Sequence, residues 1–189
     1  MRKVIAAINM TLDGFCDHTA GIADDELHQH YNELLKSGDS LLYGRITYQL
    51  MESYWPGVVK NPTGNKSEDD FAGLIDELKK IVFSRTLKKV EWKNSKLATK
   101  SLKEEVLELK QQPGKPILAG SPSLIAQLMQ LDLIDEYQLC VHPIVLGKGL
   151  TLFKNINEMK YLKLIKTKTF ASGAIVLYYV PIKNSQSED

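Results

Sequence analysis

The chain has 189 residues, of which 43% are hydrophobic and 25% are charged, and its formal net charge is +1. This composition is typical of one globular domain, and so small a charge gives no field that would gather nucleic acid or an anionic membrane. No stretch reaches the ~20 apolar residues that span a bilayer, and the apolar segment after Met1 is too short for the core of a signal peptide. We therefore expect a cytoplasmic protein that binds neither nucleic acid nor membrane.

Strand and helix patterns alternate along most of the chain. Apolar runs and helical spacing predict these elements in chain order: a strand at 4–8, a helix from Asp24 or Asp25 to 37–38, a strand at 40–43, a helix at 46–54, a helix at 71–78, a strand at 81–83, a helix from Ser101, a strand at 116–119, a helix from Ser121, and strands at 137–142, 161–170 and 174–180. Strands that alternate with helices favour a mostly parallel sheet with helices on both faces.

Local signals mark several of the boundaries. Trp55-Pro56-Gly57 is expected to end the second helix, and residues 57–68 are rich in Gly, Pro, Asn and Lys, as in a mobile loop. Ser101 to Glu104 has the form of a capping box, and Ser121 can cap a helix that has Pro122 at its first position.

The end of the chain has a different pattern. Ser172-Gly173 is expected to join the last two strands as an antiparallel hairpin. We expect one α/β domain over residues 1–183, followed by a disordered polar tail at 184–189.

Three predicted strand ends carry groups suited to phosphate. The segments are Gly44-Arg45-Ile46-Thr47, Ser84-Arg85-Thr86 and Gly120-Ser121-Pro122-Ser123. Glycine lets the backbone approach a ligand, a helix N-terminus offers free N–H groups, and arginine can bind a phosphate through two nitrogens. Each segment by itself could equally be a turn or an ordinary helix cap, but together, at the ends of strands of one sheet, they favour a phosphorylated ligand.

Other chemistries find less support. The four histidines, at 18, 28, 30 and 142, do not share a face or a ligand spacing, so we expect no metal site. A nucleophile elbow, a P-loop and the GxGxxG pattern are all missing. Asp13, just after the first strand, is a candidate proton donor or substrate anchor, although an Asp-Gly turn explains it as well.

In this order, the motifs resemble the family that contains dihydrofolate reductase and the C-terminal reductase domain of the bifunctional riboflavin-biosynthesis deaminase/reductase. The resembling segments are Ala6-Ala7, Thr11 to Phe15, Gly44 to Tyr48, Ser84 to Leu87, Ala119 to Leu124 and Pro143 to Gly149. The resemblance implies a dihydrofolate-reductase-like fold with about eight strands, a homodimer, and NADPH as the cofactor. It places the Ala7 backbone at the nicotinamide carboxamide and Ser84 and Arg85 at the 2′-phosphate. The other phosphates would meet Gly44, Arg45, Thr47, Gly120, Ser121, Pro122 and Ser123.

The chain also departs from this family. Leu118 occupies a position where riboflavin-type reductases have an acidic residue, and the first helix lacks the carboxylate that faces the pterin in dihydrofolate reductases. We expect hydride transfer from NADPH to a small carbonyl or heterocyclic substrate, for example a pterin- or pyrimidine-like ring, that is neither dihydrofolate nor the riboflavin intermediate. The alternatives are a nucleotide-binding module without efficient turnover and a purely structural domain.

Overall fold

The computed structural model describes residues 1–22, 24–154, 156 and 158–182. In chain order its elements are β1 (Val4–Thr11), α1 (Asp25–Ser37), β2 (Ser40–Gly44), α2 (Arg45–Lys60), α3 (Lys66–Glu77), β3 (Lys79–Phe83), β4 (Ser95–Leu97), α4 (Leu102–Gln111), β5 (Ile117–Ala119), α5 (Pro122–Gln130), β6 (Glu136–His142), β7 (Leu162–Thr169) and β8 (Ile175–Pro181). Within this part of the chain, no helix is both long and apolar enough to cross a bilayer.

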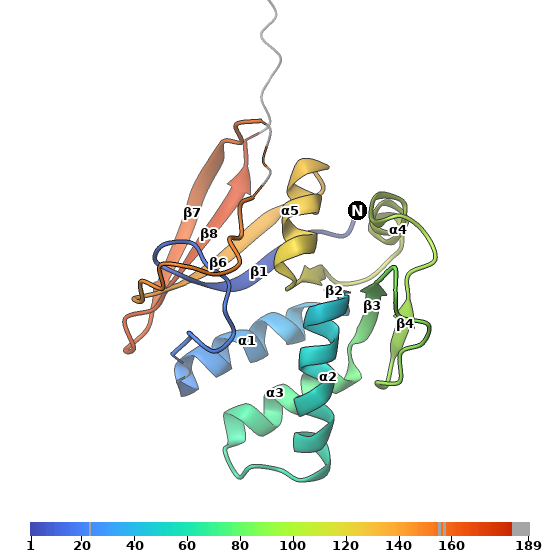
Figure 1. Cartoon of the computed structure of the whole chain (residues 1–189), viewed down its shortest axis with the longest axis horizontal. Coiled ribbons are helices and arrows are strands. Elements are labelled where there is room, and N and C mark those ends of the chain that lie inside the picture. The colour runs from blue at the N-terminus through green and yellow to red at the C-terminus, as the bar shows by residue number, and fades with distance from the viewer. Residues whose placement is uncertain (23, 155, 157, 183–189) are drawn as a thin grey trace, which may run out of the picture.

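The strands form one sheet of eight in the order β4-β3-β2-β5-β1-β6-β8-β7. The first six of these are parallel, and β8 pairs antiparallel with both β6 and β7. Figure 1 shows α4 and α5 on one face of the sheet and α1, α2 and α3 on the other. This confirms the predicted α/β class, the helices on both faces and the C-terminal hairpin. The predicted tail at 184–189 lies outside the described residues.

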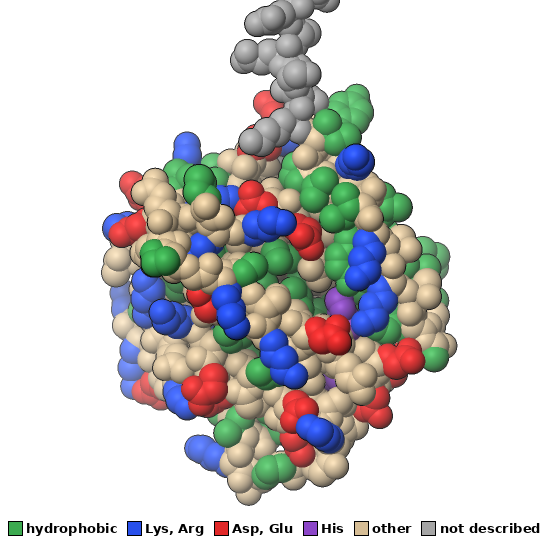
Figure 2. All heavy atoms as spheres, turned by 180° about the vertical axis from the view of Figure 1, so that it is seen from behind, with side chains coloured by type: hydrophobic (Ala, Val, Ile, Leu, Met, Phe, Trp, Pro, Cys, Tyr) green, Lys and Arg blue, Asp and Glu red, His purple; other side chains and the backbone are tan. Residues whose placement is uncertain are grey.

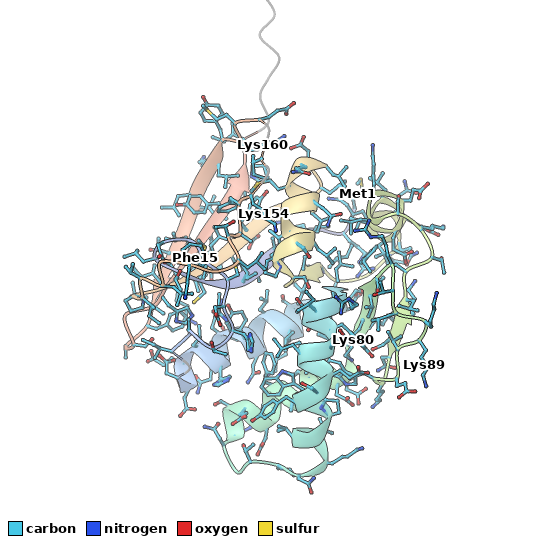
Figure 3. All side chains as sticks on the ribbon, viewed as in Figure 1. Met1, Phe15, Lys80, Lys89, Lys154 and Lys160 are labelled. Carbon is cyan, nitrogen blue, oxygen red and sulfur yellow. The ribbon has the colours of Figure 1, made fainter. Side chains whose placement is uncertain are left out.

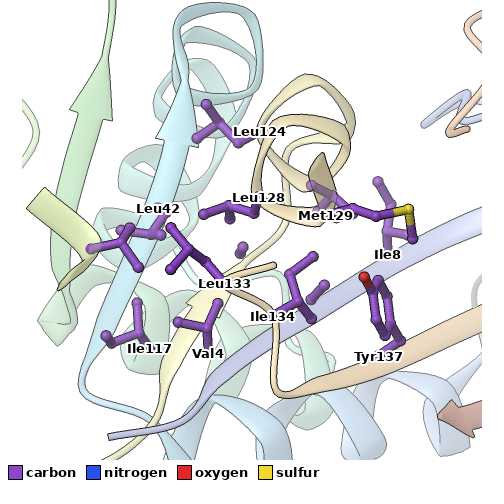
Figure 4. Packing of buried hydrophobic residues seen from close by; sticks show 14 of the residues in the cluster. Val4, Ile8, Leu42, Ile117, Leu124, Leu128, Met129, Leu133, Ile134 and Tyr137 are labelled. Carbon is purple, nitrogen blue, oxygen red and sulfur yellow. The ribbon is translucent and has the colours of Figure 1, made fainter. Parts of the chain in front are cut away.

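The central strands divide their side chains between two hydrophobic cores. The core under α4 and α5, part of which is drawn in Figure 4, takes Val4, Leu42, Ile81 and Ile117 from the sheet. The core under α1, α2 and α3 takes Ile5, Leu41, Val82 and Leu118. Successive side chains of a strand point to opposite faces, so an uninterrupted apolar run fills both cores.

The second helix is longer than predicted, because Pro56 lies inside α2 and does not end it. A proline within a helix costs about 3 kcal/mol, mainly through a lost hydrogen bond and a steric clash. Packing offsets this cost: the ring of Trp55 lies 4.5 Å from that of Phe71 on α3, and Val58 is buried. The segment 57–68 is therefore mostly helical, and the loop between α2 and α3 is only five residues, 61–65.

The sequence patterns did not reveal β4, a strand of three residues at the edge of the sheet. Next to β4, Lys80 is fully buried (Figure 3), although it lies between the predicted helix at 71–78 and the predicted strand at 81–83, where the sequence gave no reason to expect a buried charge. Its Nζ donates to the carbonyl oxygens of Asp76, Leu78 and Lys93 at 2.9–3.0 Å and lies 4.3 Å from the centre of the Trp92 ring. Burial lowers the pKa of Lys80 to about 8. These contacts anchor the connection between β3 and β4.

Candidate functional site

The candidate site lies at the carboxyl edge of the parallel strands. In the register of the sheet, Gly44 at the end of β2 pairs with Phe83 at the end of β3, and Ala119 at the end of β5 pairs with both Leu42 and Ala6. The segments that follow these ends are therefore neighbours, since adjacent strands are only ~4.8 Å apart. The three predicted phosphate segments thus come from adjacent strands at one edge.

Two of these segments are in direct contact. The hydroxyl of Ser121 accepts a hydrogen bond from the Gly44 N–H at 2.9 Å, and Ser121 is 1% exposed. A Cβ added to Gly44 would lie 3.4 Å from Oγ of Ser123, so glycine keeps the turns close. Ser121 does occupy the N-cap position of α5, but its side chain makes no capping bond. The predicted capping role of this hydroxyl is wrong, because it bonds to the neighbouring turn instead.

The helices that begin at these turns differ from the other helices of the described chain. The first turns of α1, α3 and α4 carry acidic residues, and the side chains of Asp24, Asn65 and Ser101 cap them, the last in the predicted capping box. The first turns of α2 and α5 carry no acidic residue, and no side chain caps them. The first N–H groups of a helix lack intrahelical partners and its N-terminus is partly positive. Both helix starts are therefore suited to an anion.

Arginine adds positive charge at the same edge. Arg45 and Arg85 are exposed at the ends of the neighbouring strands β2 and β3. Within the described chain neither forms an ion pair, and Arg45 bonds only to the neutral Gln49 side chain, at 3.1 Å. The third arginine, Arg2, pairs with Asp39 at the opposite edge. Two arginines without a carboxylate partner are thus left beside the helix starts.

The remaining predicted cofactor residues also lie at this edge. Ser84 Oγ accepts from the backbone N–H groups of Thr86 and Leu87 at 3.1 and 2.9 Å, which closes the turn that carries Arg85. A Cβ added to Gly120 would lie 3.7 Å from the Ala7 carbonyl oxygen, so the end of β1 adjoins the turn after β5. Thr47 lies in the first turn of α2 and Pro122 begins α5. The structure brings these residues together, and their contacts with a ligand stay predictions.

Asp13 has a clear structural position. Its carboxylate accepts from the Thr11 hydroxyl at 2.6 Å and from the N–H groups of Leu146 and Gly147 at 3.1 and 2.8 Å. These bonds lower its pKa, the Thr11 hydroxyl having the largest effect. The loops after β1 and β6 also meet in an isolated antiparallel bridge between Phe15, labelled in Figure 3, and Thr151. Asp13 joins these two loops as a carboxylate, which suits an anchor better than a proton donor.

A second group of polar residues at this edge was missed from the sequence. Asn9, which follows Ala7 by two residues on β1, bonds through Oδ1 to the Tyr31 hydroxyl on α1 at 2.8 Å and to Nε2 of His142 on β6 at 3.1 Å. Nδ1 of His142 accepts from the Ile22 N–H at 3.2 Å. No short motif connects these residues. The pairing of β1 with β6 and the packing of α1 bring them together.

Two hollows with defined linings lie away from this edge, one beside α5 at Met129 and Ile156 and another between α1 and α3 at Gln29 and Asn32. The described residues include no cluster of three or more His, Cys, Asp or Glu side chains that could hold a metal ion. The residues at the edge of the sheet instead offer hydrogen-bond donors and guanidinium groups, which bind anions.

Comparisons with known proteins agree with this architecture. The chain is 35% identical over 182 residues to the uncharacterized protein YyaP of Bacillus subtilis, covering 94% of each chain. The structure matches a diaminohydroxyphosphoribosylaminopyrimidine deaminase/5-amino-6-(5-phosphoribosylamino)uracil reductase of Thermotoga maritima with a TM-score of 0.64 and 18% identity, covering 96% of this chain and 57% of that one. It matches a dihydrofolate reductase of Enterococcus faecalis, complexed with NADP(H), with a TM-score of 0.60 and 14% identity, covering 94% and 96%.

At these identities the solved structures establish the dihydrofolate-reductase-like fold alone. The family is established separately, because the model of the RibD C-terminal domain matches residues 2–176. Together with the eight-stranded sheet, this match confirms the resemblance inferred from the motifs. The chain belongs to the RibD C-terminal domain family.

Proposed function

We propose that this protein is an NADPH-dependent reductase that transfers a hydride to a small heterocyclic substrate, pterin- or pyrimidine-like. The observation that carries the proposal is the pair of helix starts, α2 and α5, which lack capping side chains and acidic residues. They adjoin Arg45 and Arg85, neither of which forms an ion pair with a described residue. A dinucleotide brings several phosphates to one binding site. The family and the NADP(H)-bound structural relative supply the choice of cofactor.

The residues at the edge fit this cofactor. Arg45 and the first turn of α2, including Thr47, would hold one part of the pyrophosphate, and Ser123 at the start of α5 the other. Ser84 and Arg85, one strand further along, would hold the 2′-phosphate. The Gly44 N–H is already bonded to Ser121, so in this proposal these two residues keep the turns in place. Bound NADPH supplies the hydride, and the chain positions the reacting groups.

The substrate side of the edge lacks the carboxylates of the better-known reductases. Leu118 is 3% exposed in the core under α1, and Tyr31 of α1 directs its hydroxyl to Asn9. A pocket that loses a group matched to its substrate loses ~10⁴-fold or more in discrimination. We therefore propose that neither dihydrofolate nor the ribosylaminouracil intermediate of riboflavin synthesis is an efficient substrate. The same absence favours the second candidate, a nucleotide-binding module without efficient turnover.

We also propose that the protein is a homodimer. The support is the family resemblance together with exposed apolar residues at the β7–β8 end, where Leu164 is 48% and Tyr161 54% exposed. Figure 2 shows hydrophobic and basic side chains side by side at this end of the molecule. A second copy of the chain would cover this apolar surface.

The cofactor proposal is tested by the affinities for NADPH and NADH. We expect NADPH to bind more tightly than NADH, and Arg85→Ala to reduce mainly this preference. Arg45→Ala should weaken the binding of both by about 1.5–3 kcal/mol, as a charge-assisted hydrogen bond would, with the melting temperature of the ligand-free protein nearly unchanged. Lys103→Ala, which removes one positive charge on α4, is the matched control. Equal dissociation constants for NADPH and NADH, measured by calorimetry at fixed ionic strength, would contradict the assignment.

Turnover is tested separately. Steady-state NADPH oxidation with dihydrofolate or with the ribosylaminouracil intermediate should stay below ~10⁴ M⁻¹s⁻¹ in kcat/KM, the lower end for ordinary enzymes. A higher value for either compound would show that its recognition does not need the missing carboxylate. Tight NADPH binding without oxidation across a broad panel of heterocycles would favour the second candidate.

A further inference from the structure

A hollow of about 350 Å³ lies between α1 and α3, which cover the same face of the sheet (Figure 1). From α1 it is lined by Asp25, Gln29 and Asn32, which share one side of the helix at spacings of four and three residues. From α3 it is lined by Lys66, Ser67 and Asp70. Asn32 and Ser67 are buried, whereas the other lining residues are exposed. The hollow therefore has a buried floor and an exposed rim.

The floor carries a hydrogen-bond acceptor without a partner. Asn32 is 5% exposed, and its Nδ2 donates to the Ser67 carbonyl oxygen at 2.9 Å. Its Oδ1 is buried and has no hydrogen-bond partner among the described residues. Turning the amide by 180° would place Oδ1 against the Ser67 carbonyl oxygen, two acceptors facing each other. The bond to Ser67 thus fixes the orientation that leaves this oxygen free, and a buried acceptor without a donor costs free energy.

The charges beside this acceptor favour a cation. Oδ1 of Asp25 accepts from Nδ2 of Asn65 at 3.0 Å and from the Ser67 hydroxyl at 2.8 Å. These bonds lower the pKa of Asp25, that of Asn65 having the largest effect, so the group is a carboxylate at neutral pH. Lys66 and Asp70 form an ion pair at 2.6 Å, and their charges cancel. Asp25 is therefore the uncompensated charge of the lining. Asn32 and Asp25 lie close together, since both bond to Ser67.

The start of α3 does not oppose a cation. Oδ1 of Asn65 accepts from the N–H groups of Ser67 and Glu68 at 2.9 and 3.1 Å, and the first turn carries the acidic residues Glu68 and Asp69. This helix start is capped and acidic, the reverse of the starts of α2 and α5. The volume of the hollow lies in the range of small-molecule pockets and far exceeds that of one metal ion. The lining thus suits a small organic cation that carries hydrogen-bond donors.

We propose that the hollow between α1 and α3 binds a small organic cation through a primary ammonium group. An N–H of the ammonium donates to Oδ1 of Asn32, and the carboxylate of Asp25 balances its charge. The bound group thereby satisfies the free acceptor and the uncompensated charge together. Water is the competing occupant of a polar hollow. The site lies outside the proposed cofactor edge, and the proposal does not depend on NADPH.

The test compares two cations of equal charge and chain length. Butylammonium has three N–H donors, and butyltrimethylammonium has none. We expect the wild-type protein to bind butylammonium about 10-fold more tightly, as one charge-assisted hydrogen bond allows, in titrations followed by NMR of the ligand. Asn32→Leu removes the acceptor and should abolish this preference. Asp25→Asn keeps an oxygen for Asn65 and Ser67 but removes the charge, so it should weaken the binding of both cations about 5-fold.

The matched control is Glu26→Gln, which removes a negative charge from the same turn of α1 but outside the lining. It should keep the wild-type affinities. Thermal unfolding shows whether each variant is folded, and Asp25→Asn decides the case if Asn32→Leu does not fold. No binding of butylammonium at millimolar concentration, the result if water alone fills the hollow, overturns the proposal. Equal wild-type affinities for the two cations overturn it as well. So does an unchanged preference in folded Asn32→Leu, or an effect of Asp25→Asn no larger than that of Glu26→Gln.

Discussion

The two ends of the sheet are built differently. At the β3–β2–β5 end both faces are covered by helices, and residues such as Leu42 and Ile117 are fully buried. At the β8–β7 end one face packs against α1 through Val176 and Tyr178. On the other face Leu164 of β7, which pairs with Tyr179, is 48% exposed. No helix among the described residues packs over this side of β7.

This difference shows what the order of strands decides. Parallel neighbours need crossover connections, and the helices of these connections cover the sheet. The hairpin of β7 and β8 needs only a short turn, at Ser172-Gly173, and so supplies no covering helix. The covered end can hold a ligand edge in a rigid position, whereas the open end offers a surface for a second chain.

The largest expected effect is a difference in unfolding free energy between two Leu→Ala variants, one at each end of the sheet. Leu42→Ala should lower the free energy of unfolding by about 2–5 kcal/mol, because it removes a fully buried side chain and leaves a cavity. Leu164→Ala should cost less than about 1 kcal/mol at protein concentrations where the chain is monomeric. Urea denaturation of both variants measures the difference. Similar losses would mean that the β8–β7 end is covered in solution.

The next largest expected effect is the loss of unfolding free energy at acidic pH. His30 on α1 is 5% exposed among aromatic rings, including Phe170 and Tyr178, and burial lowers its pKa from 6.5 to about 4. Since the unfolded chain binds this proton first, stability is fully present above pH 6.5 and falls by up to about 3 kcal/mol as the pH drops toward 4. His30→Phe should reduce this loss.

Some pH dependence should remain in His30→Phe, because burial also lowers the pKa of His142. The free energy of unfolding, measured at intervals between pH 4 and pH 7, gives the slope for each variant. His18→Phe, at an exposed histidine, is the control for adding an aromatic ring. If His30→Phe kept the full wild-type slope, the acid sensitivity would have to arise away from the contacts of His30 with Phe170 and Tyr178.

The smallest expected change in stability accompanies a change in assembly. Leu164→Asp should alter the unfolding free energy of the monomer by about 0.5 kcal/mol or less, since the side chain is exposed. A charge in an apolar contact between two copies should nevertheless separate the proposed dimer. Light scattering after size-exclusion chromatography measures the mass of both proteins. A wild-type protein that elutes as a monomer at micromolar concentration would refute the dimer.

Local patterns in the sequence predicted much of the fold. Leu41 and Leu42 read as a buried strand because both faces need apolar residues, and Ser101 to Glu104 reads as a helix start because both capping partners are local. The strand-end motifs were also local, and the order of the strands placed them at one edge. The sequence-based predictions failed where a contact distant in the chain decided the structure. For example, the packing of Trp55 against Phe71 helps α2 to continue through Pro56.

The sequence by itself determined the α/β class, the family resemblance and the glycine and arginine residues at the strand ends, because each of these depends on residues close together in the chain. Only the tertiary structure decided which side chains meet there. Gly44 and Ser121 are 77 residues apart, and Asn9 and His142 are 133 apart, and each pair bonds because parallel strands bring their ends to one edge. The Ile22 N–H extends the second pair through its bond to His142, and no pattern of neighbouring residues encodes such a series of bonds.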